Sequence, residues 1–191
     1  SGPKTTINAD ATSKTVEVDS AGRRNTDIRN AQGEITELTE LDVDGKYTSI
    51  EKTSDGGLDT YESKGEISNR DIENAEGKIT KSTEFGPNDS SYSLENNEHG
   101  GLTTRETADG VTNTDIENAQ GEIIESREHG KNGEYVSIEK TSDGGLDTYV
   151  KENGVANRDI ENAQGEIIKS TEHGPNDSSY SLENNEHGGL T

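Results

Sequence analysis

The chain contains no cysteine, methionine or tryptophan among its 191 residues. Without cysteine there is no disulfide framework, no thiolate zinc site and no thiol chemistry. No apolar run approaches the roughly 18 residues that a membrane-spanning helix needs, so we expect no membrane insertion. The first three residues, Ser1-Gly2-Pro3, look like the remnant of a protease cleavage. We therefore expect that native targeting residues once preceded them.

Hydrophobic residues are also scarce, at 24% of the chain, and aromatic residues make up 4%. The hydrophobic share is about half of the 45–50% that is usual for globular domains, so a thick, closed core is not expected. Such a composition is typical of intrinsic disorder. However, β-branched residues and turn signals recur in a fixed phase, which a disordered tract has no reason to keep. We therefore interpret the chain as folded.

Negative charge dominates, because 40 Asp and Glu residues face 18 Lys and Arg residues and the net charge is −22. Nucleic-acid binding depends on Lys and Arg side chains that neutralise phosphates. Docking on an anionic membrane surface likewise depends on clusters of basic residues. The sequence therefore argues against both nucleic acid and anionic membrane as partners.

The chain is built from an internal repeat. One column of residues in steps of 22 is always Ile or Leu: Ile28, Ile50, Ile72, Leu94, Ile116, Ile138, Ile160 and Leu182. Periods of 44 and 88 residues are superimposed on it, and Tyr47–Thr103 nearly repeats at Tyr135–Thr191. Fixed periods of this length indicate a repeat architecture. We expect residues 1–14 to be a lead-in and residues 15–191 to be a single array, cut from a longer one.

Glycine-containing turns separate short runs of β-favouring residues, which indicates an all-β protein. For the turn Asn118–Glu122, a three-residue hairpin loop with Gly121 in the left-handed conformation pairs Asn118 with Glu122. The same turn predicts that Glu117 pairs with Ile123 and Ile116 with Ile124. The next three turns, the last of them centred on Asn153, predict that Ile124 pairs with Ile138, Ile138 with Leu146, and Leu146 with Ile160.

These pairings place one apolar row across the sheet, on a single face because strands alternate sides with period 2. The predicted members of this apolar row are Ile28, Ile50, Leu58, Ile72, Leu94, Leu102, Ile116, Ile124, Ile138, Leu146, Ile160, Ile168, Leu182 and Leu190. The predicted fold is all-β, with tandem 22-residue β-hairpin repeats forming an elongated, coiled antiparallel sheet. We expect the sheet to coil, or to pair with a second sheet, so that the apolar row is enclosed. Because the row continues across neighbouring hairpins, duplication of the repeat can lengthen the array.

A parallel β-solenoid with 22-residue coils is the alternative fold. In a solenoid, glutamates 22 residues apart, such as Glu117 and Glu139, would stack at the spacing of neighbouring strands. Like charges that lie directly opposite each other destabilise a sheet. Arg70 and Arg158 would in addition point into the solenoid core. These features favour the antiparallel hairpins, and the solenoid stays open as the second interpretation.

The segment Asp115–Ile124, which reads DIENAQGEII, resembles the YD repeats of bacterial Rhs and teneurin proteins. Those repeats carry Tyr-Asp, two further residues and then Gly-Arg-Leu-Thr. In this chain Ile116-Glu117 stands for Tyr-Asp, Gly121 for the glycine and Glu122-Ile123 for Arg-Leu. The resemblance covers the repeats from residue 15 onward. It implies a spiralling sheet of hairpins in a surface protein, and it carries over no catalytic residue.

No group of residues indicates catalysis, and we predict that the chain is not an enzyme. Asp42-Val43-Asp44-Gly45 and Asn88-Asp89-Ser90 resemble parts of calcium loops. Neither completes the 12-residue EF-hand pattern, so plain turn chemistry is the favoured interpretation. Asp42, Asp44 and Asp89 are therefore weak metal candidates, and calcium is the one cofactor that the sequence suggests.

Four tyrosines, Tyr47, Tyr61, Tyr135 and Tyr149, are predicted to lie opposite the apolar row and to form a candidate contact face. The sequence as a whole predicts a non-enzymatic, extracellular or cell-surface structural protein, of bacterial type, that acts as a fibre, stalk or biofilm matrix component. Its expected partners are neighbouring repeats or other copies. One alternative is an adhesin-type module that recognises glycan or surface protein through the tyrosine- and asparagine-rich face. Another is a calcium-responsive acidic scaffold.

Overall fold

The computed structural model describes residues 2–185 and 189, and every regular element in this range is a β-strand. The described residues form no helix, and therefore no helix that is long and apolar enough to cross a membrane. Two compact units divide the chain, Ser1–Glu95 and Asn96–Thr191. The all-β fold confirms the class that the turn spacing predicts.

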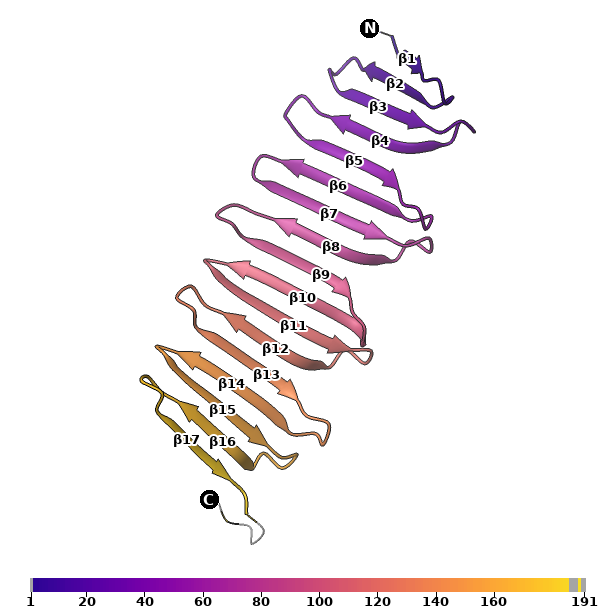
Figure 1. Cartoon of the computed structure of the whole chain (residues 1–191). Coiled ribbons are helices and arrows are strands. Elements are labelled where there is room, and N and C mark those ends of the chain that lie inside the picture. Colours follow the sequence, from indigo (N-terminus) through magenta and orange to yellow (C-terminus); the bar gives the residue numbers. More distant parts are fainter. Residues whose placement is uncertain (1, 186–188, 190–191) are drawn as a thin grey trace. The chain divides into compact units, whose positions relative to one another are not determined.

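Figure 1 shows the strands of each unit following one another in chain order. The first unit contains β1 (Lys4–Ile7), β2 (Ser13–Val18), β3 (Arg24–Arg29), β4 (Ile35–Leu41), β5 (Tyr47–Lys52), β6 (Leu58–Lys64), β7 (Ile67–Glu73), β8 (Ile79–Phe85) and, up to the unit boundary, β9 (Ser91–Asn96). The second contains β10 (Gly100–Ala108), β11 (Val111–Asn118), β12 (Ile123–His129), β13 (Tyr135–Lys140), β14 (Leu146–Glu152), β15 (Val155–Glu161), β16 (Ile167–His173) and β17 (Ser179–Glu183). The stretch expected to be a lead-in contains β1 and the start of β2.

Within each unit, each strand pairs antiparallel with the next strand in the sequence. In the described part of each unit, a strand contacts only the strands that directly precede and follow it in the sequence. This arrangement confirms tandem hairpins. It also excludes the solenoid alternative, because a solenoid requires parallel pairing between segments 22 residues apart.

The predicted hairpin turn at Asn118–Glu122 is present. The amide of Asn118 donates to the carbonyl of Glu122 over 2.9 Å, and the amide of Gly121 donates to the carbonyl of Asn118 over 3.0 Å. Gly121 has a φ of +77°, which glycine adopts without the steric cost of a Cβ. The Asn118 side chain accepts hydrogen bonds from the amides of Gln120 and Glu122. Asparagine therefore holds the loop in the conformation that the hairpin requires.

The strand register differs from the predicted one beyond this turn. Ile116 lies opposite Glu125 and not Ile124, because β12 contains a β-bulge. The predicted pair of Glu117 with Ile123 is present. The pairs predicted across the later turns are wrong: Ile138 lies opposite Ser126 and Thr148, and Leu146 lies opposite Lys140 and Glu161. The loops between β12 and β13 and between β13 and β14 are each centred one residue later than predicted. The partner of Ile138 is therefore two residues away from the predicted one, on the same face of the sheet.

The apolar row therefore divides between two faces, contrary to the prediction. Following the paired residues, Ile50, Leu58 and Leu94 share one face of the first unit, while Ile28 and Ile72 lie on the other. In the second unit Ile138, Leu146 and Leu182 share one face, while Ile116 and Ile160 lie on the other. Leu102, Ile124 and Ile168 lie at irregular register positions, and Leu190 lies outside the described residues.

Two local features cause this division. One is the β-bulge, which adds one residue to a strand and so reverses the alternation of its side chains. The other is the two-residue loop Asn153-Gly154, where both residues have positive φ angles of 51° and 79°, as a type I′ turn requires. The bulge recurs in β4, β8, β12 and β16, and a two-residue loop recurs at positions 65–66, 109–110 and 153–154. The faces therefore return to their starting assignment every 44 residues. The structural repeat is therefore 44 residues long.

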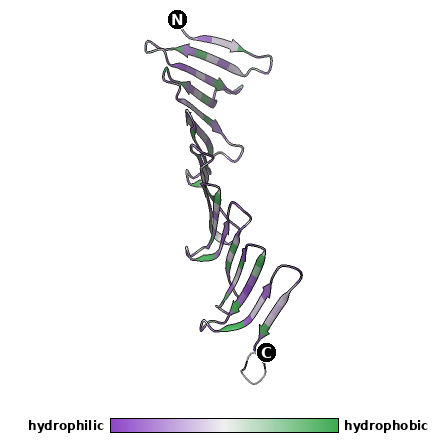
Figure 2. Cartoon of the chain, turned by 90° about the vertical axis from the view of Figure 1, so that its left-hand side faces the viewer, coloured by the Kyte–Doolittle hydropathy of each residue, from purple (hydrophilic) through white to green (hydrophobic). Residues whose placement is uncertain are grey.

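Each unit is a sheet without an enclosed core. No hydrophobic side chain is buried among the described residues, and Ile138 keeps 39% of its surface exposed. Hydrophobic and hydrophilic residues alternate along the strands in Figure 2, with no second layer packed on the ribbon of either unit. The expectation that coiling or a second sheet encloses the apolar residues is therefore wrong. The main-chain hydrogen bonds and cross-strand side-chain pairs must supply most of the stability.

Candidate binding face

The strand pairing places most aromatic side chains on one face of each unit. We call it the tyrosine face: it contains Tyr47 and Tyr61 in the first unit and Tyr135 and Tyr149 in the second. In the first unit Tyr61 pairs with Ser49, the neighbour of Ile50, and therefore lies on the face opposite Ile50. In the second unit Tyr149 likewise pairs with Ser137 and lies opposite Ile138. The two rings on this face lie close together in each unit, with centroids 6.1 Å apart in the first unit and 5.8 Å apart in the second.

A groove of about 540 Å³ lies on the tyrosine face of the first unit. An ion pair crosses it: Arg70 Nε lies 2.9 Å from Asp59 Oδ1, and Arg70 Nη2 lies 2.5 Å from Asp59 Oδ2. These hydrogen bonds from the guanidinium hold the pKa of Asp59 below its usual range. The other lining residues come from β5 to β8 and are Ser49, Glu51, Tyr61, Ser68, Ile72, Lys81, Thr83 and Phe85.

The second unit has an equivalent groove of about 580 Å³. Its lining residues are Tyr135, Ser137, Glu139, Asp147, Tyr149, Arg158, Thr171 and His173, and seven of them stand 88 residues after a lining residue of the first groove. The guanidinium of Arg158 again holds both oxygens of Asp147, at 2.9 and 2.5 Å, and lowers the pKa of this aspartate. His173 replaces Phe85. The chain therefore carries the same arrangement of tyrosine, ion pair and glutamate twice.

Negative charge is distributed unequally between the faces, as the second unit shows. We call the face opposite the tyrosines the acidic face. On the described strands of the second unit it carries one cation, Lys140, and the acids Glu106, Asp115, Glu117, Glu128, Glu152, Asp159, Glu161 and Glu172. The tyrosine face there carries the acids Glu125, Glu139, Asp147 and Glu183 and the cations Arg105, Arg127, Lys151, Arg158 and Lys169.

The first unit has the same asymmetry. Its acidic face carries Glu17, Asp27, Glu40, Glu62, Asp71, Glu73 and Glu84 together with Arg29, Lys52 and Lys64. Its tyrosine face carries Glu37, Glu51, Asp59 and Glu95 together with Lys4, Lys14, Arg24, Arg70 and Lys81. The strongly negative net charge of the chain is therefore not shared by the tyrosine face, where acids and bases nearly balance.

One cross-strand pair on the tyrosine face differs between successive 44-residue blocks. Lys81 lies opposite Glu95 with Nζ 2.8 Å from Oε2, whereas the corresponding pair in β4 and β5 is Glu37 opposite Glu51. Opposed like charges destabilise a sheet. We expect Glu37→Lys to raise the free energy of unfolding by about 0.5 kcal/mol at low salt, and by less at high salt.

Urea unfolding monitored by circular dichroism measures this change. The reverse substitution, Lys81→Glu, is the matched control and should lower the free energy of unfolding by a similar amount. If both variants unfold at the urea concentration of the natural sequence, the expected cross-strand effect is absent.

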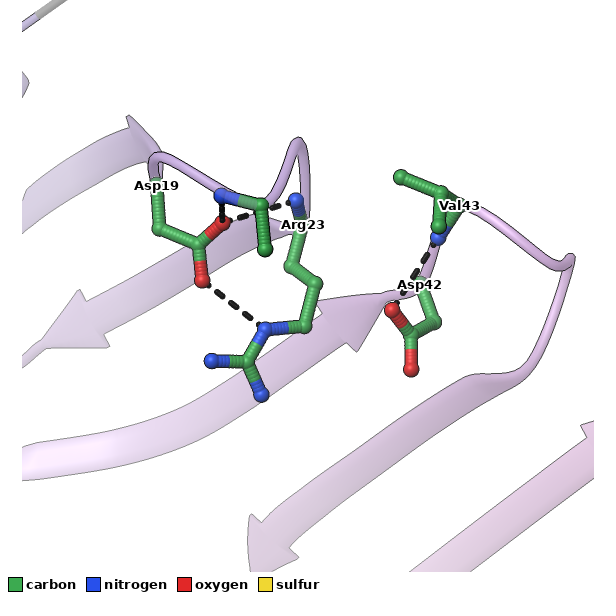
Figure 3. Close-up of polar contacts among 5 residues, drawn as sticks. Asp19, Arg23, Asp42 and Val43 are labelled. Atoms are coloured by element: carbon green, nitrogen blue, oxygen red, sulfur yellow. Dashed lines mark hydrogen bonds and ion pairs between the residues drawn. The ribbon is translucent and has the colours of Figure 1, made fainter.

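The aspartates proposed as metal candidates take part in turns. Figure 3 shows Asp42 accepting a hydrogen bond from the amide of Val43, beside the turn in which Asp19 accepts bonds from Arg23. Asp44 Oδ2 lies 2.5 Å from Lys64 Nζ, which lowers the pKa of this aspartate. Asp89 has a positive φ of 58°. No group of three or more His, Asp or Glu side chains suited to a metal occurs in the described range. Calcium binding stays a prediction.

Sequence reasoning missed the two ion pairs. Arg70 and Arg158 attract attention in the sequence only because they are unsuited to a solenoid core. Their distance of 11 residues from Asp59 and Asp147 is the signal that could have identified the pairs, since the same offset joins strands across the two-residue turn. The lining residues of the grooves could not be predicted from the sequence, because this requires the strand register that decides which residues share a face.

Comparison with known proteins adds no family to this description. No family model matches the chain, and the search of curated proteins gives no match. The resemblance to YD repeats therefore stays a prediction.

Proposed function

We propose that this chain is a non-enzymatic structural protein of the cell surface or extracellular matrix. In this role the repeats act as a spacer, which holds apart the structures attached on either side of them. One observation carries the proposal. Within each unit, strands contact only their sequence neighbours in the described range, as in repeat proteins whose stability is a sum over neighbouring units. A sheet of this kind can be lengthened by copying a block, without redesigning a core.

Two further features support a structural role. The 44-residue block restores both faces of the sheet, so whole blocks can be added without moving apolar or charged residues to the wrong side. The net charge of −22 favours solubility of a long array and opposes unspecific association. The apolar row does not carry this proposal, because it is divided between two faces. The proposal rests on the pairing of each strand with its sequence neighbours.

Insertion of a second copy of residues 47–90 between Lys46 and Tyr47 tests the proposal. The natural chain has no cysteine, so cysteines introduced at Glu17 in β2 and at the original Glu84 in β8 provide the only spin-label sites. Because the insertion adds four strands, we expect the label-to-label distance in the first unit to grow by about 19 Å. Pulsed electron paramagnetic resonance measures this distance.

The matched control is an insertion of 44 residues of Gly and Ser at the same place, which should give a broad range of distances. A broad distribution for the copied block as well, or an unchanged distance, would contradict the proposal. The calcium-responsive scaffold is distinguished by titrating calcium while the hydrodynamic size is measured. The adhesin-type alternative has a specific structural feature in its favour, which is the pair of grooves.

A further inference from the structure

We propose that the two grooves on the tyrosine face bind a neutral saccharide, with one site in each unit. This inference goes beyond the spacer function and does not depend on it. Each groove combines a half-exposed tyrosine ring, an ion pair that joins neighbouring strands, and serine and threonine hydroxyl groups in its lining. Their volumes of about 540 and 580 Å³ are in the range usual for ligand sites, where a few fixed polar groups orient a ligand against apolar surface.

The fold itself does not require these residues. The hairpin of β10 and β11 has a two-residue turn like that of β6 and β7, but the positions of Asp59, Tyr61 and Arg70 are occupied there by Thr103, Arg105 and Thr114. The tyrosine and the ion pair therefore return only after 88 residues, although the sheet repeats after 44. A sheet can be built without this combination of side chains, so a purely structural role does not account for it.

The side chains in the first groove leave hydrogen-bonding groups free for a ligand. The Asp59 carboxylate is held by Arg70. By contrast, the Tyr61 hydroxyl, the Glu51 carboxylate and the Thr83 hydroxyl make no hydrogen bond to other described side chains or main-chain groups. A hexose ring has an apolar face that can pack on an aromatic ring, and hydroxyls that can donate to a carboxylate and accept from a guanidinium.

Charge selects a neutral ligand. Lys81 and Arg70 offset Glu51 and Asp59 in the first groove, so the site has little net charge. The net charge of −22 repels polyanions such as acidic polysaccharides. A cationic peptide is attracted to the other face, where most of the acidic residues of the strands lie. A neutral saccharide is the ligand class that these three conditions favour together.

The test is isothermal titration of the full chain with four hexasaccharides: cellohexaose, laminarihexaose, maltohexaose and chitohexaose. We expect at least one of these neutral ligands to bind with two sites per chain. The combined substitution Tyr61→Ala and Tyr149→Ala should weaken binding by about tenfold or more, and Tyr149→Ala alone should reduce the stoichiometry to one. Hexagalacturonic acid, as the anionic probe, should not bind.

The chain offers a matched control. Tyr92 and Tyr180 are exposed on the acidic face, so Tyr92→Ala with Tyr180→Ala should leave saccharide binding unchanged. Glu51→Gln with Glu139→Gln is a second groove variant that leaves both tyrosines and the sheet in place, and it should also weaken binding. The proposal is overturned if no neutral hexasaccharide binds at millimolar concentration, if the groove variants bind like the natural chain, or if only hexagalacturonic acid or hexalysine binds.

Discussion

Gly145→Ala is expected to be the most destabilising small substitution in the second unit, at about 3 kcal/mol or more. A Cβ on Gly145 would lie 1.9 Å from the carbonyl oxygen of Glu161 in the next strand. The obstacle is main chain, so no side-chain rotation can relieve the clash. Strand β14 would have to move away from β15 just where Leu146 pairs with Glu161. The buried Gly57 occupies the equivalent place in the first unit, where an added Cβ would lie 1.8 Å from the carbonyl oxygen of Glu73.

The neighbouring Gly144 provides the control, because the two glycines of the same turn have different reasons to be glycine. Gly144 has a φ of +86°, and a Cβ there would make only an ordinary contact of 3.7 Å with Ala163. Gly144→Ala should therefore cost only the strain of a left-handed residue, about 1–2 kcal/mol. Urea unfolding compares the two variants. If Gly144→Ala proved the more harmful, the close approach at Gly145 would not be the reason for the second glycine.

Thr148→Pro in β14 is expected to destabilise the second unit far more than removal of a large apolar side chain from the opposed position. Thr148 lies between Ile138 and Asp159, so strands flank it on both sides. Proline removes a main-chain donor and is not tolerated in a central strand, with a cost on the order of 3 kcal/mol. Ile138→Ala should cost only about 1 kcal/mol, whereas truncation of a fully buried Ile costs 2–5 kcal/mol, because 39% of Ile138 is already exposed.

Far-UV circular dichroism during urea unfolding, with tyrosine fluorescence as a second probe, measures both free energies. Thr148→Val is the control for the loss of the threonine hydroxyl and should unfold close to the natural chain. A cost for Ile138→Ala that equals or exceeds the cost of Thr148→Pro would show that side-chain burial contributes more than the hydrogen-bonded strands, contrary to the structure described above.

Turn chemistry accounts for the parts of the fold that were predictable. Asn118 and Gly121 are three residues apart and determine one hairpin without help from distant residues, which is why that turn and its first two pairs agree with the prediction. The register failed next to it, at Ile124, because a β-bulge depends on how two strands accommodate each other. The two-residue turn at Asn153-Gly154 was readable as an Asn-Gly signal, but centring the turn on Asn153 alone assigned Ile160 to the wrong face.

The candidate site was predictable only in part. Tyr61 and Tyr149 attracted attention because tyrosine is rare in the chain and alternates with the apolar positions of β5, β6, β13 and β14. Their neighbours Asp59 and Arg70 did not, because charged residues are frequent in this sequence and most of them belong to solvated surface. The balance of charge on the tyrosine face emerged only when each charged residue had been assigned to a face.

The amino-acid sequence by itself determined the class of structure: its turn residues recur so often that only short antiparallel strands fit between them, and its shortage of apolar residues leaves no material for a closed core. Only the tertiary structure decided which side chains share a face. Side-chain direction reverses with every residue of a strand, so one bulged residue or one shortened loop moves a whole strand's side chains to the opposite side. These single-residue events are set by the contact between strands. They separate an acidic surface from the tyrosine face, on which acids and bases nearly balance.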